Sequence, residues 1–555
     1  MDPRMNELIE KLQRRTIDRR AFIAQASALG ASALAIGNVL DVTAANASQD
    51  EEGGVFIDTI DGDPPTLNYA ITAGATDGAV ASKIQEGLVW TDRDYNIHPL
   101  LAKSWEITDD GLQYTFHLQE GVLFHDGTPM TSADVKYTME EVVKQYQPTV
   151  GPVFQGISGI DTPDDLTVVV HFDEPSGPFL GSLTRTGCPI LPKHLFEGTD
   201  PLTNPHSLSE PIGTGPFMFK EWSRGESITL ERFPDYWQEN KPSIDTIIMR
   251  QVPQPASRIS SLQTGEVDYC YYYFFDVAEY ENLKDDPNLQ FRTGAGHTEA
   301  NQIIINTRNT PFDDKVVRQA LMIGIDRQFI VDAVFFGVAD VAKSSISHTI
   351  PWAYNPDVDY TTTYAYDPDR ANAMLDEAGY ARDGDYRFSL RLVYDPARAG
   401  YNAFAQILKE QWNALGVDVE VVPLERQVMI QDVFMDWNFD ATIQSYTTRG
   451  EPALGIARSY ISSSIGQASF NNASGYSNPE VDELFVQGAT HATEEQRAPF
   501  YFDAQEILQE DLPVLNIADS RGVDVGSVRF NLADSVWLGV SSNDGWEDLK
   551  MEQSE

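Results

Sequence analysis

The sequence carries few residue patterns that could perform covalent chemistry. It contains no GxSxG nucleophile motif, no HExxH zinc motif and no GxxxxGK[ST] phosphate loop. The Gly294-Ala295-Gly296 segment lacks the third glycine that a dinucleotide-binding loop requires. We therefore expect no catalytic role and no cofactor.

Metal-binding residue types are scattered along the chain. The nine His form no cluster, and Cys188 and Cys270, the two cysteines, stand far apart with no CxxC pair. A structural zinc site needs such ligands at short spacing, so we expect no metal. The two cysteines could form one disulfide or remain free and buried, and the sequence leaves both alternatives open.

Aromatic and arginine side chains offer the chemistry of solute binding instead. Tyr272, Tyr273 and Phe274 belong to an aromatic cluster at 267–275 without helical periodicity. Such rings at the end of a strand suit the wall of a ligand site, although core packing is the alternative. Arg398 precedes an expected helix, where its guanidinium could bind a carboxylate through two hydrogen bonds; the alternative is an exposed arginine.

These residues must be positioned by alternating strands and helices. β-branched and aromatic runs predict strands at 55–60, 113–118, 168–172, 228–230, 247–249, 388–393, 417–422 and 441–443. Apolar spacing predicts helices at 255–265, 315–325 and 369–378. Thr131 and Asp134 form a helix-start pattern, and Gly379 is placed as the glycine that ends a helix. The pattern indicates an α/β protein.

Seven blocks carry a family resemblance across nearly all of the expected mature chain. They are WEITDDGLQYTFHLQEGVLFHDGTPMTSADVKYT (105–138), PIGTGPF (211–217), ITLERFPDYW (228–237), LQTGEVD (262–268), PFDDKVVRQALMIGIDR (311–327), YDPDRANAMLDEAGY (366–380) and WNALGVDVE (412–420). In this order they resemble the extracellular solute-binding protein family 5, the receptors of peptide and nickel ABC importers. The resemblance implies a two-lobed periplasmic binding protein of type II, in the large class with an extra subdomain and two hinge strands.

The resemblance also implies the division of the chain. The first lobe would comprise 48–300 and 516–555, with the appended subdomain at about 96–210, and the second lobe would comprise 301–515. In the family this subdomain is usually remote from small ligands, so the resemblance implies structural roles for His117 and His125. The chain would cross between lobes at 301–306 and return near 512–518. A cleft between the lobes would then close on the solute.

Site residues follow from the same resemblance. On the first lobe they are Asp61, in the loop after the first strand, the aromatic trio 272–274, and His297 at the first hinge. On the second lobe they are Arg398 and the loop 445–452, with Tyr446, Thr447, Arg449 and Glu451. Peptide receptors of the family hold an Asp in that loop, whereas Glu451 is its only acid here. The hydroxyls and Arg449 therefore favour an anionic or polyhydroxylated solute over a free ammonium group.

The N-terminus predicts export. Arg19-Arg20 precedes an apolar run at 24–40, and Ala45-Asn46-Ala47 supplies a cleavage site, so residues 1–47 resemble a Tat-type signal peptide despite Asp18 at a position usually held by Ser or Thr. An uncleaved amphipathic helix is the alternative. No Cys follows the apolar run, so we expect a periplasmic protein without a lipid anchor.

Charge restricts the partners. A net charge of -45 excludes nucleic acid, which needs concentrated Lys and Arg. We expect a monomer that captures a peptide or peptide-like solute and delivers it to the transmembrane subunits of an ABC permease. The alternatives are a receptor for an opine, an oligosaccharide or a metal chelate, or a periplasmic sensor or chaperone-like module.

Overall fold

A computed structural model describes residues 53–92, 95–271, 274–396, 398, 400–466, 470–532 and 545–552, apart from the side chains of 293–297. The predicted signal peptide at 1–47 lies outside these residues. In the part of the chain that is described, no helix has both the length and the apolar character needed to cross a membrane.

One large sheet runs through both lobes. Its strands are β1 (Val55–Ile60), β8 (Phe217–Ser223), β9 (Ser227–Arg232), β10 (Thr246–Gln251), β11 (Tyr269–Cys270), β12 (Leu289–Ile305), β13 (Ala339–Val341), β14 (Phe388–Tyr394), β15 (Val417–Pro423), β16 (Ala441–Thr447) and β17 (Val514–Ser527). Within the described residues the order is β15-β14-β16-β12-β17-β11-β1-β10-β9-β8, with β13 paired to β17. The strands predicted from the sequence are all present.

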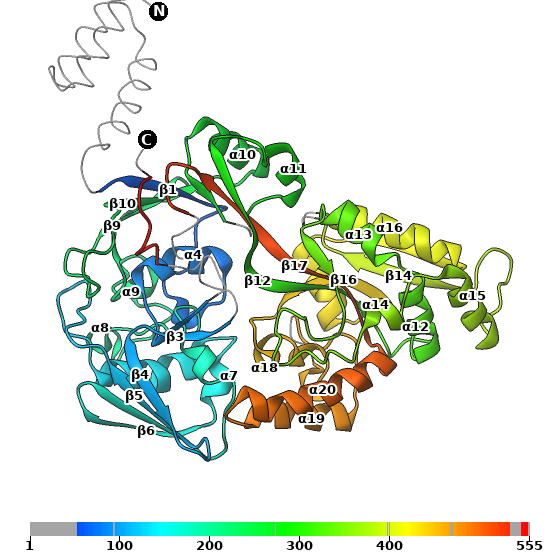
Figure 1. The fold of residues 1–555 in the computed structure, drawn as a ribbon, viewed down its shortest axis with the longest axis horizontal. Helices are drawn as coiled ribbons and strands as arrows, with labels where there is room; N and C mark the ends of the chain where they lie inside the picture. Colours follow the sequence, from blue (N-terminus) through cyan, green and yellow to red (C-terminus); the bar gives the residue numbers. More distant parts are fainter. Residues whose placement is uncertain are drawn as a thin grey trace, which may run out of the picture.

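β12 and β17 join the lobes. They pair antiparallel from Leu289↔Ser527 to Ile304↔Val514, with register shifts near the crossing point, and Figure 1 shows them passing from one lobe to the other. Such shifts bend a strand pair locally. The predicted crossing segments, 301–306 and 512–518, overlap the second-lobe ends of these strands, where Ile303, Ile305 and Leu515 lie in the second-lobe core.

The second lobe has helices on both faces of its sheet. They are α12 (Lys315–Ile323), α13 (Arg327–Val334), α14 (Tyr360–Thr363), α15 (Pro368–Glu377), α16 (Tyr401–Ala414), α17 (Arg426–Ile430), α18 (Pro452–Gly455), α19 (Pro479–Thr490) and α20 (Glu494–Asp511). Side chains alternate along β12: Ile303 and Ile305 pack against the α12 and α16 side, and Ile304 packs against the α19 and α20 side. This alternation makes a three-layer α/β lobe.

The first lobe packs α4 (Ala75–Ile84) and α10 (Pro255–Thr264) against β1, β10 and their neighbours, with α11 (Tyr280–Leu283) near the hinge. The C-terminal segment returns to this core, where Trp546 and Phe530 pack against Phe56 at ring separations of 5.2 and 4.9 Å. Cys188 and Cys270 are buried free thiols, so they form no disulfide with each other.

The subdomain has its own sheet and core. Its elements are β4 (Ala102–Ile107), β5 (Gln113–Leu118), β6 (Ile157–Asp164), β7 (Thr167–Phe172), α5 (Ser132–Tyr137), α7 (Gly151–Phe154), α8 (Lys193–Phe196) and α9 (Pro205–Leu208), with the hairpin β2 (Val89–Thr91) and β3 (Ile97–Pro99) beside it. The sheet order is β4-β5-β7-β6. Thr131 and Asp134 form the predicted capping box of α5. Alternate residues of β5 and β7 are buried, as one-sided strands require.

Candidate solute site between the lobes

The loop after β16 turns the chain back toward the second-lobe helices. Arg449 and Gly450 have φ angles of 57° and 67°, in the left-handed region that glycine enters readily and arginine does not. Glu451 then caps α18, because its Oε1 accepts the Ala453 N–H at 3.0 Å. The turn and the cap fix the loop that the sequence assigns to the solute.

Arg449 reaches from this loop to the subdomain. Its Nη2 donates to Thr149 Oγ1 at 3.3 Å. A second contact between the two bodies lies nearby, where the Gly177 N–H donates to the Ala489 carbonyl at 2.8 Å. A Cβ at Gly177 would lie 2.4 Å from Arg497 Nε, so this approach requires glycine. The two lobes therefore touch at defined points in this structure.

A cavity of about 560 Å³ lies between the subdomain and the second lobe. Its walls combine aromatic rings with charged side chains. The lining includes Trp90, Tyr95, Tyr114, Arg185, Trp237 and Lys241 from the first-lobe side and Arg449, Gly450, Glu451, Glu494 and Arg497 from the second lobe. Two of the predicted site residues, Arg449 and Glu451, thus share one interlobe space.

The Glu451 carboxylate is held within the second lobe. Arg497 donates to it through two nitrogens, at 2.8 and 2.5 Å, and the Arg497 guanidinium lies 4.7 Å from the Trp352 ring centroid. A planar guanidinium that donates two charge-assisted hydrogen bonds to one carboxylate forms a stronger pairing than neutral hydrogen bonds do. Glu451 therefore faces the cavity with its charge already matched.

A second polar group lies on the hinge side of β16, and we call it the polar cluster: Glu299, Arg398, Tyr401 and Ser445. Arg398 Nη2 lies 3.8 Å from Glu299 Oε2, and the Ser445 hydroxyl donates to the same oxygen at 2.7 Å. The Arg398 guanidinium lies 5.8 Å from the Tyr401 ring centroid. Glu299 on β12 and Arg398 in the loop before α16 thus place a carboxylate and a cation near each other.

Tyr401 adds a buried hydroxyl group to the polar cluster. Its side chain is buried, and its hydroxyl makes no hydrogen bond of ordinary geometry to any described residue. Burial raises the pKa of Tyr401, and the neighbouring Arg398 opposes that rise. A buried hydroxyl normally has a partner, and Arg398 and Ser445 are the polar groups that act on this one.

Tyr446 and Thr447, the other predicted site residues near the end of β16, lie on opposite sides of the strand. Tyr446 is buried on the opposite side of β16 from Ser445, where its ring packs against Phe470 at 6.3 Å and lies 4.7 Å from the Arg458 guanidinium. Burial raises the pKa of Tyr446, against the effect of Arg458. Thr447 is half-buried and pairs with Glu299 in the ladder between β12 and β16. Only Thr447 therefore adjoins the polar cluster.

Of the first-lobe candidates, the structure describes the side chains of Asp61 and Phe274. Asp61 is exposed after β1 and accepts a hydrogen bond from Thr76 Oγ1 at 2.6 Å. Phe274 belongs to the first-lobe core, 5.5 Å from the Tyr271 ring. Tyr272 and Tyr273 lie outside the described residues, as does the side chain of His297. The core-packing alternative is therefore the one that Phe274 adopts.

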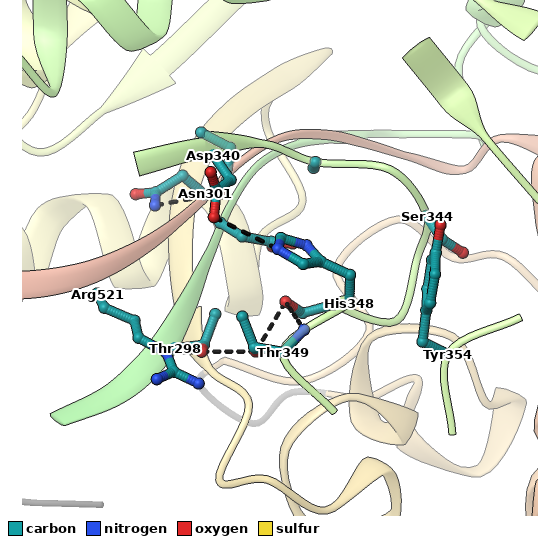
Figure 2. Close-up of polar contacts among 12 residues, drawn as sticks. Thr298, Asn301, Asp340, Ser344, His348, Thr349, Tyr354 and Arg521 are labelled. Atoms are coloured by element: carbon teal, nitrogen blue, oxygen red, sulfur yellow. Dashed lines mark hydrogen bonds and ion pairs between the residues drawn. The ribbon is translucent and has the colours of Figure 1, made fainter. Parts of the chain in front are cut away.

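A polar network links the hinge strands to the second-lobe segment 340–349 (Figure 2). Thr298 Oγ1 lies 2.7 Å from Thr349 Oγ1 and accepts the Arg521 Nε–H at 3.2 Å. His348 lies between two carboxylates, 3.3 Å from Asp340 Oδ2 and 3.5 Å from Asp519 Oδ2. These contacts fix the second-lobe segment 340–349 to the hinge strands β12 and β17.

Sequence reasoning missed Glu299, Tyr401 and Ser445 as a group with Arg398. Glu299 is a charged residue inside a strand, two positions after His297, which is the one local signal that could have drawn attention to it. Among the described residues, no group of three His, Cys, Asp or Glu side chains could hold a metal ion. His125 has the structural role expected of it: its Nε2 lies 2.9 Å from the Gly215 carbonyl, and burial lowers its pKa to about 4.

Two lobes joined by a pair of strands, with polar side chains gathered between them, define a ligand-binding protein of the periplasmic type. Residues 96–467 match the bacterial extracellular solute-binding proteins, family 5 (middle). This match covers more than half of the chain, and the chain belongs to that family. It is therefore an extracellular solute-binding protein, as the sequence blocks predict.

Similar proteins of this family carry different ligand names. The chain is 29% identical over 455 residues to heme-binding protein A of Haemophilus influenzae, covering 77% of this chain and 80% of that protein. It is 28% identical over 487 residues to the oligopeptide-binding protein AppA of Bacillus subtilis, covering 84% of this chain and 86% of AppA. Family membership therefore leaves the solute open.

Solved structures share the fold. The substrate-binding protein CtaP of Listeria monocytogenes superposes with a TM-score of 0.79 at 24% identity, over 91% of this chain and 100% of CtaP. The Bacillus subtilis AppA structure, in complex with a nonapeptide, gives a TM-score of 0.74 at 24% identity, over 90% of this chain and 99% of AppA. The two-lobed fold with its extra subdomain is thus confirmed.

Proposed function

We propose that this protein is the substrate-binding component of an ABC importer and that it binds a peptide or peptide-like solute between its lobes. It delivers the solute to the transmembrane subunits of the permease from the periplasm, as a monomer without a lipid anchor. Family membership and the relatives named as oligopeptide- and dipeptide-binding proteins support the class. The predicted signal peptide supports the location.

The polar cluster is the observation that carries the choice of solute. A peptide has an ammonium group and a carboxylate, and Glu299 and Arg398 offer one partner for each. Arg398 can bind a carboxylate through two nitrogens, and the Tyr401 hydroxyl can donate to it as well. Glu299 supplies the acid that the loop 445–452 lacks. A zwitterionic solute therefore matches the cluster better than a purely anionic one.

Binding and closure are sufficient for this function, so we propose no catalytic role. A solute that contacts both lobes stabilises the closed arrangement by as much as it binds that arrangement more tightly than the open one. The two hinge strands permit such a rigid-body motion. The permease then distinguishes the loaded protein from the empty one by shape.

Blocked peptides test the proposal. Calorimetric titration of the signal-cleaved protein with trialanine, C-amidated trialanine and N-acetylated trialanine separates the two ends of the solute. We expect either block to weaken binding, because each removes one charge-assisted hydrogen-bond partner. Arg398→Ala should weaken the binding of unblocked trialanine by about 10- to 100-fold. In this variant, C-amidation should have no further effect on affinity. The exposed second-lobe Arg370→Ala is the matched control and should bind like wild type.

No binding of trialanine by wild type, together with a non-peptide adduct in native mass spectrometry, would overturn the peptide assignment. An opine, oligosaccharide or metal chelate would then be the solute. It would be bound by the hydroxyls of Thr447 and Thr448 and by the guanidinium of Arg449. In that case Arg449→Ala would weaken the binding of that solute without unfolding the protein. The importer role itself would stand.

A further inference from the structure

Tyr95 lies at the tip of the hairpin formed by β2 and β3, on the first-lobe side. Its N–H donates to the Asp92 carbonyl at 3.0 Å, and the Asp92 N–H donates to the Asn96 carbonyl at 3.0 Å, which closes the turn. Tyr95 has a φ of 67°. A bulky residue in the left-handed region costs energy, so contacts elsewhere must hold it there.

Those contacts come from the hinge and the second lobe. We call Thr298, Gly450 and Arg521 the socket. The Thr298 N–H donates to the Tyr95 hydroxyl at 3.2 Å, and the Arg521 guanidinium lies 6.0 Å from the Tyr95 ring centroid. A Cβ at Gly450 would lie 1.9 Å from Tyr95 Cδ1, so the ring occupies the space that any other residue would fill.

Of the three socket residues, Thr298 and Arg521 belong to the hinge strands β12 and β17, and Gly450 belongs to the second lobe. Thr298 is fixed by Thr349 and Arg521, as Figure 2 shows, and Thr349 is fixed in turn by the Ser347 hydroxyl at 2.9 Å. Gly450 belongs to the loop between β16 and α18. The Tyr95 ring also packs against the apolar core of the second lobe. A first-lobe side chain is therefore inserted where the hinge strands meet the second lobe.

We propose that Tyr95 is a latch that stabilises contact between the lobes. Its hydrogen bond with Thr298, which is itself bonded to Thr349 of the second lobe, and its packing against the second-lobe core require the hairpin to reach the second lobe. These contacts therefore favour the closed arrangement over the open one. A two-state protein whose binding-competent form gains population binds its solute more tightly by the same factor. This consequence for the solute rests on the proposed function, whereas the latch itself does not.

Spin labels measure the latch without any solute. Cys188 and Cys270 are buried, so label attached at exposed Thr203→Cys in the subdomain and Glu377→Cys on α15 reports the distance between the lobes. Wild type should show a population at the short distance. Tyr95→Ala should reduce that population about five- to ten-fold relative to the open one, from loss of ring burial and the hydrogen bond. Tyr366→Ala, an exposed tyrosine of the second lobe, should leave the distances unchanged.

Two further variants identify the contact. Tyr95→Phe keeps the ring and loses only the bond from Thr298, so it should lie between wild type and Tyr95→Ala. Gly450→Ala should displace the Tyr95 ring and reduce the short-distance population as much as Tyr95→Ala does. The double variant should have the same short-distance population as either single variant. Identical distance distributions for wild type and Tyr95→Ala would overturn the latch. Additive effects of Tyr95→Ala and Gly450→Ala would equally overturn it, because independent sites add.

Discussion

Arg185 shows how single side chains hold the first lobe together. It is buried between two carboxylates, 2.7 Å from Glu547 Oε1 and 3.3 Å from Glu86 Oε1. Burial raises the pKa of Glu86, with Arg185 opposing the rise, whereas at the nearer Glu547 the attraction of Arg185 overcomes the desolvation and lowers the pKa. Glu86 also accepts hydrogen bonds from Tyr236 and Trp237, so the buried charge is fully surrounded by donors.

Replacing Arg185 with methionine should strongly destabilise the protein. The variant leaves two carboxylates buried without their cation, which costs about 3–5 kcal/mol of unfolding free energy. Calorimetry at pH 7 should find a lower unfolding temperature, and the loss should shrink as pH falls, because protonation of the carboxylates removes the uncompensated charge. The exposed Arg370→Met is the control. An unfolding temperature equal to that of wild type would show that the triad contributes no net stability.

His348 carries the pH response of the hinge segment. The Asp519 carboxylate on β17, 3.5 Å from Nδ1, raises the pKa of His348, and Asp340 on β13 adds to the rise. Desolvation and Lys343 act in the opposite direction. The Tyr354 ring packs against the imidazole at 6.4 Å. A raised folded pKa means that the stabilisation is fully present below the ordinary value of 6.5 and is lost as pH rises through the folded value.

We therefore expect His348→Gln to lower the unfolding temperature more at about pH 5.5 than at about pH 8.5, with a difference of about 1–2 °C in a chain of this size. Asp519→Asn should remove most of this difference, since it removes the nearest carboxylate on the hinge strand. Thermal unfolding followed by circular dichroism at both pH values measures it. A loss of equal size at both pH values would contradict the assignment of a charged role to His348.

Local sequence signals predicted the elements well. β-branched runs gave the strands, Thr131 and Asp134 gave the start of α5, and Gly379, with a φ of 91°, stands directly after the C-cap of α15. The helix at 315–325 ends at Ile323, two residues early, because Gly324 already serves as the C-cap. These features depend on neighbours a few residues away, which the sequence displays directly.

The site depends on residues far apart in the chain, and this is why it was only partly predictable. Arg398 and Arg449 were placed between the lobes from residue type and family position. Glu299 could not be joined to Arg398, nor Arg497 to Glu451, because each pairing arises from tertiary packing of separate elements. Tyr95 carries no signal in its own hairpin, since its contacts are with Thr298 and Gly450, which lie more than 200 positions away in the sequence.

The charge of the whole molecule bears on its stability. With 84 acidic and 39 basic residues the chain has a net charge of -45, and its surface carboxylates repel one another within the compact state. Salt shortens the range of this repulsion to about 3 Å at 1 M, compared with about 30 Å at 0.01 M. The repulsion opposes folding and also opposes any approach of the two lobes.

Thermal stability should therefore increase with ionic strength. Between about 0.01 and 0.5 M NaCl we expect the unfolding temperature to rise by about 2–5 °C, because screening relieves repulsion that is stronger in the compact chain than in the unfolded one. Choline chloride at equal ionic strength should give the same rise, since screening depends on charge and not on the identity of the cation. A rise with NaCl alone would instead indicate a specific sodium site, and a constant or falling unfolding temperature would show that the acidic surface is already neutralised by its own ion pairs.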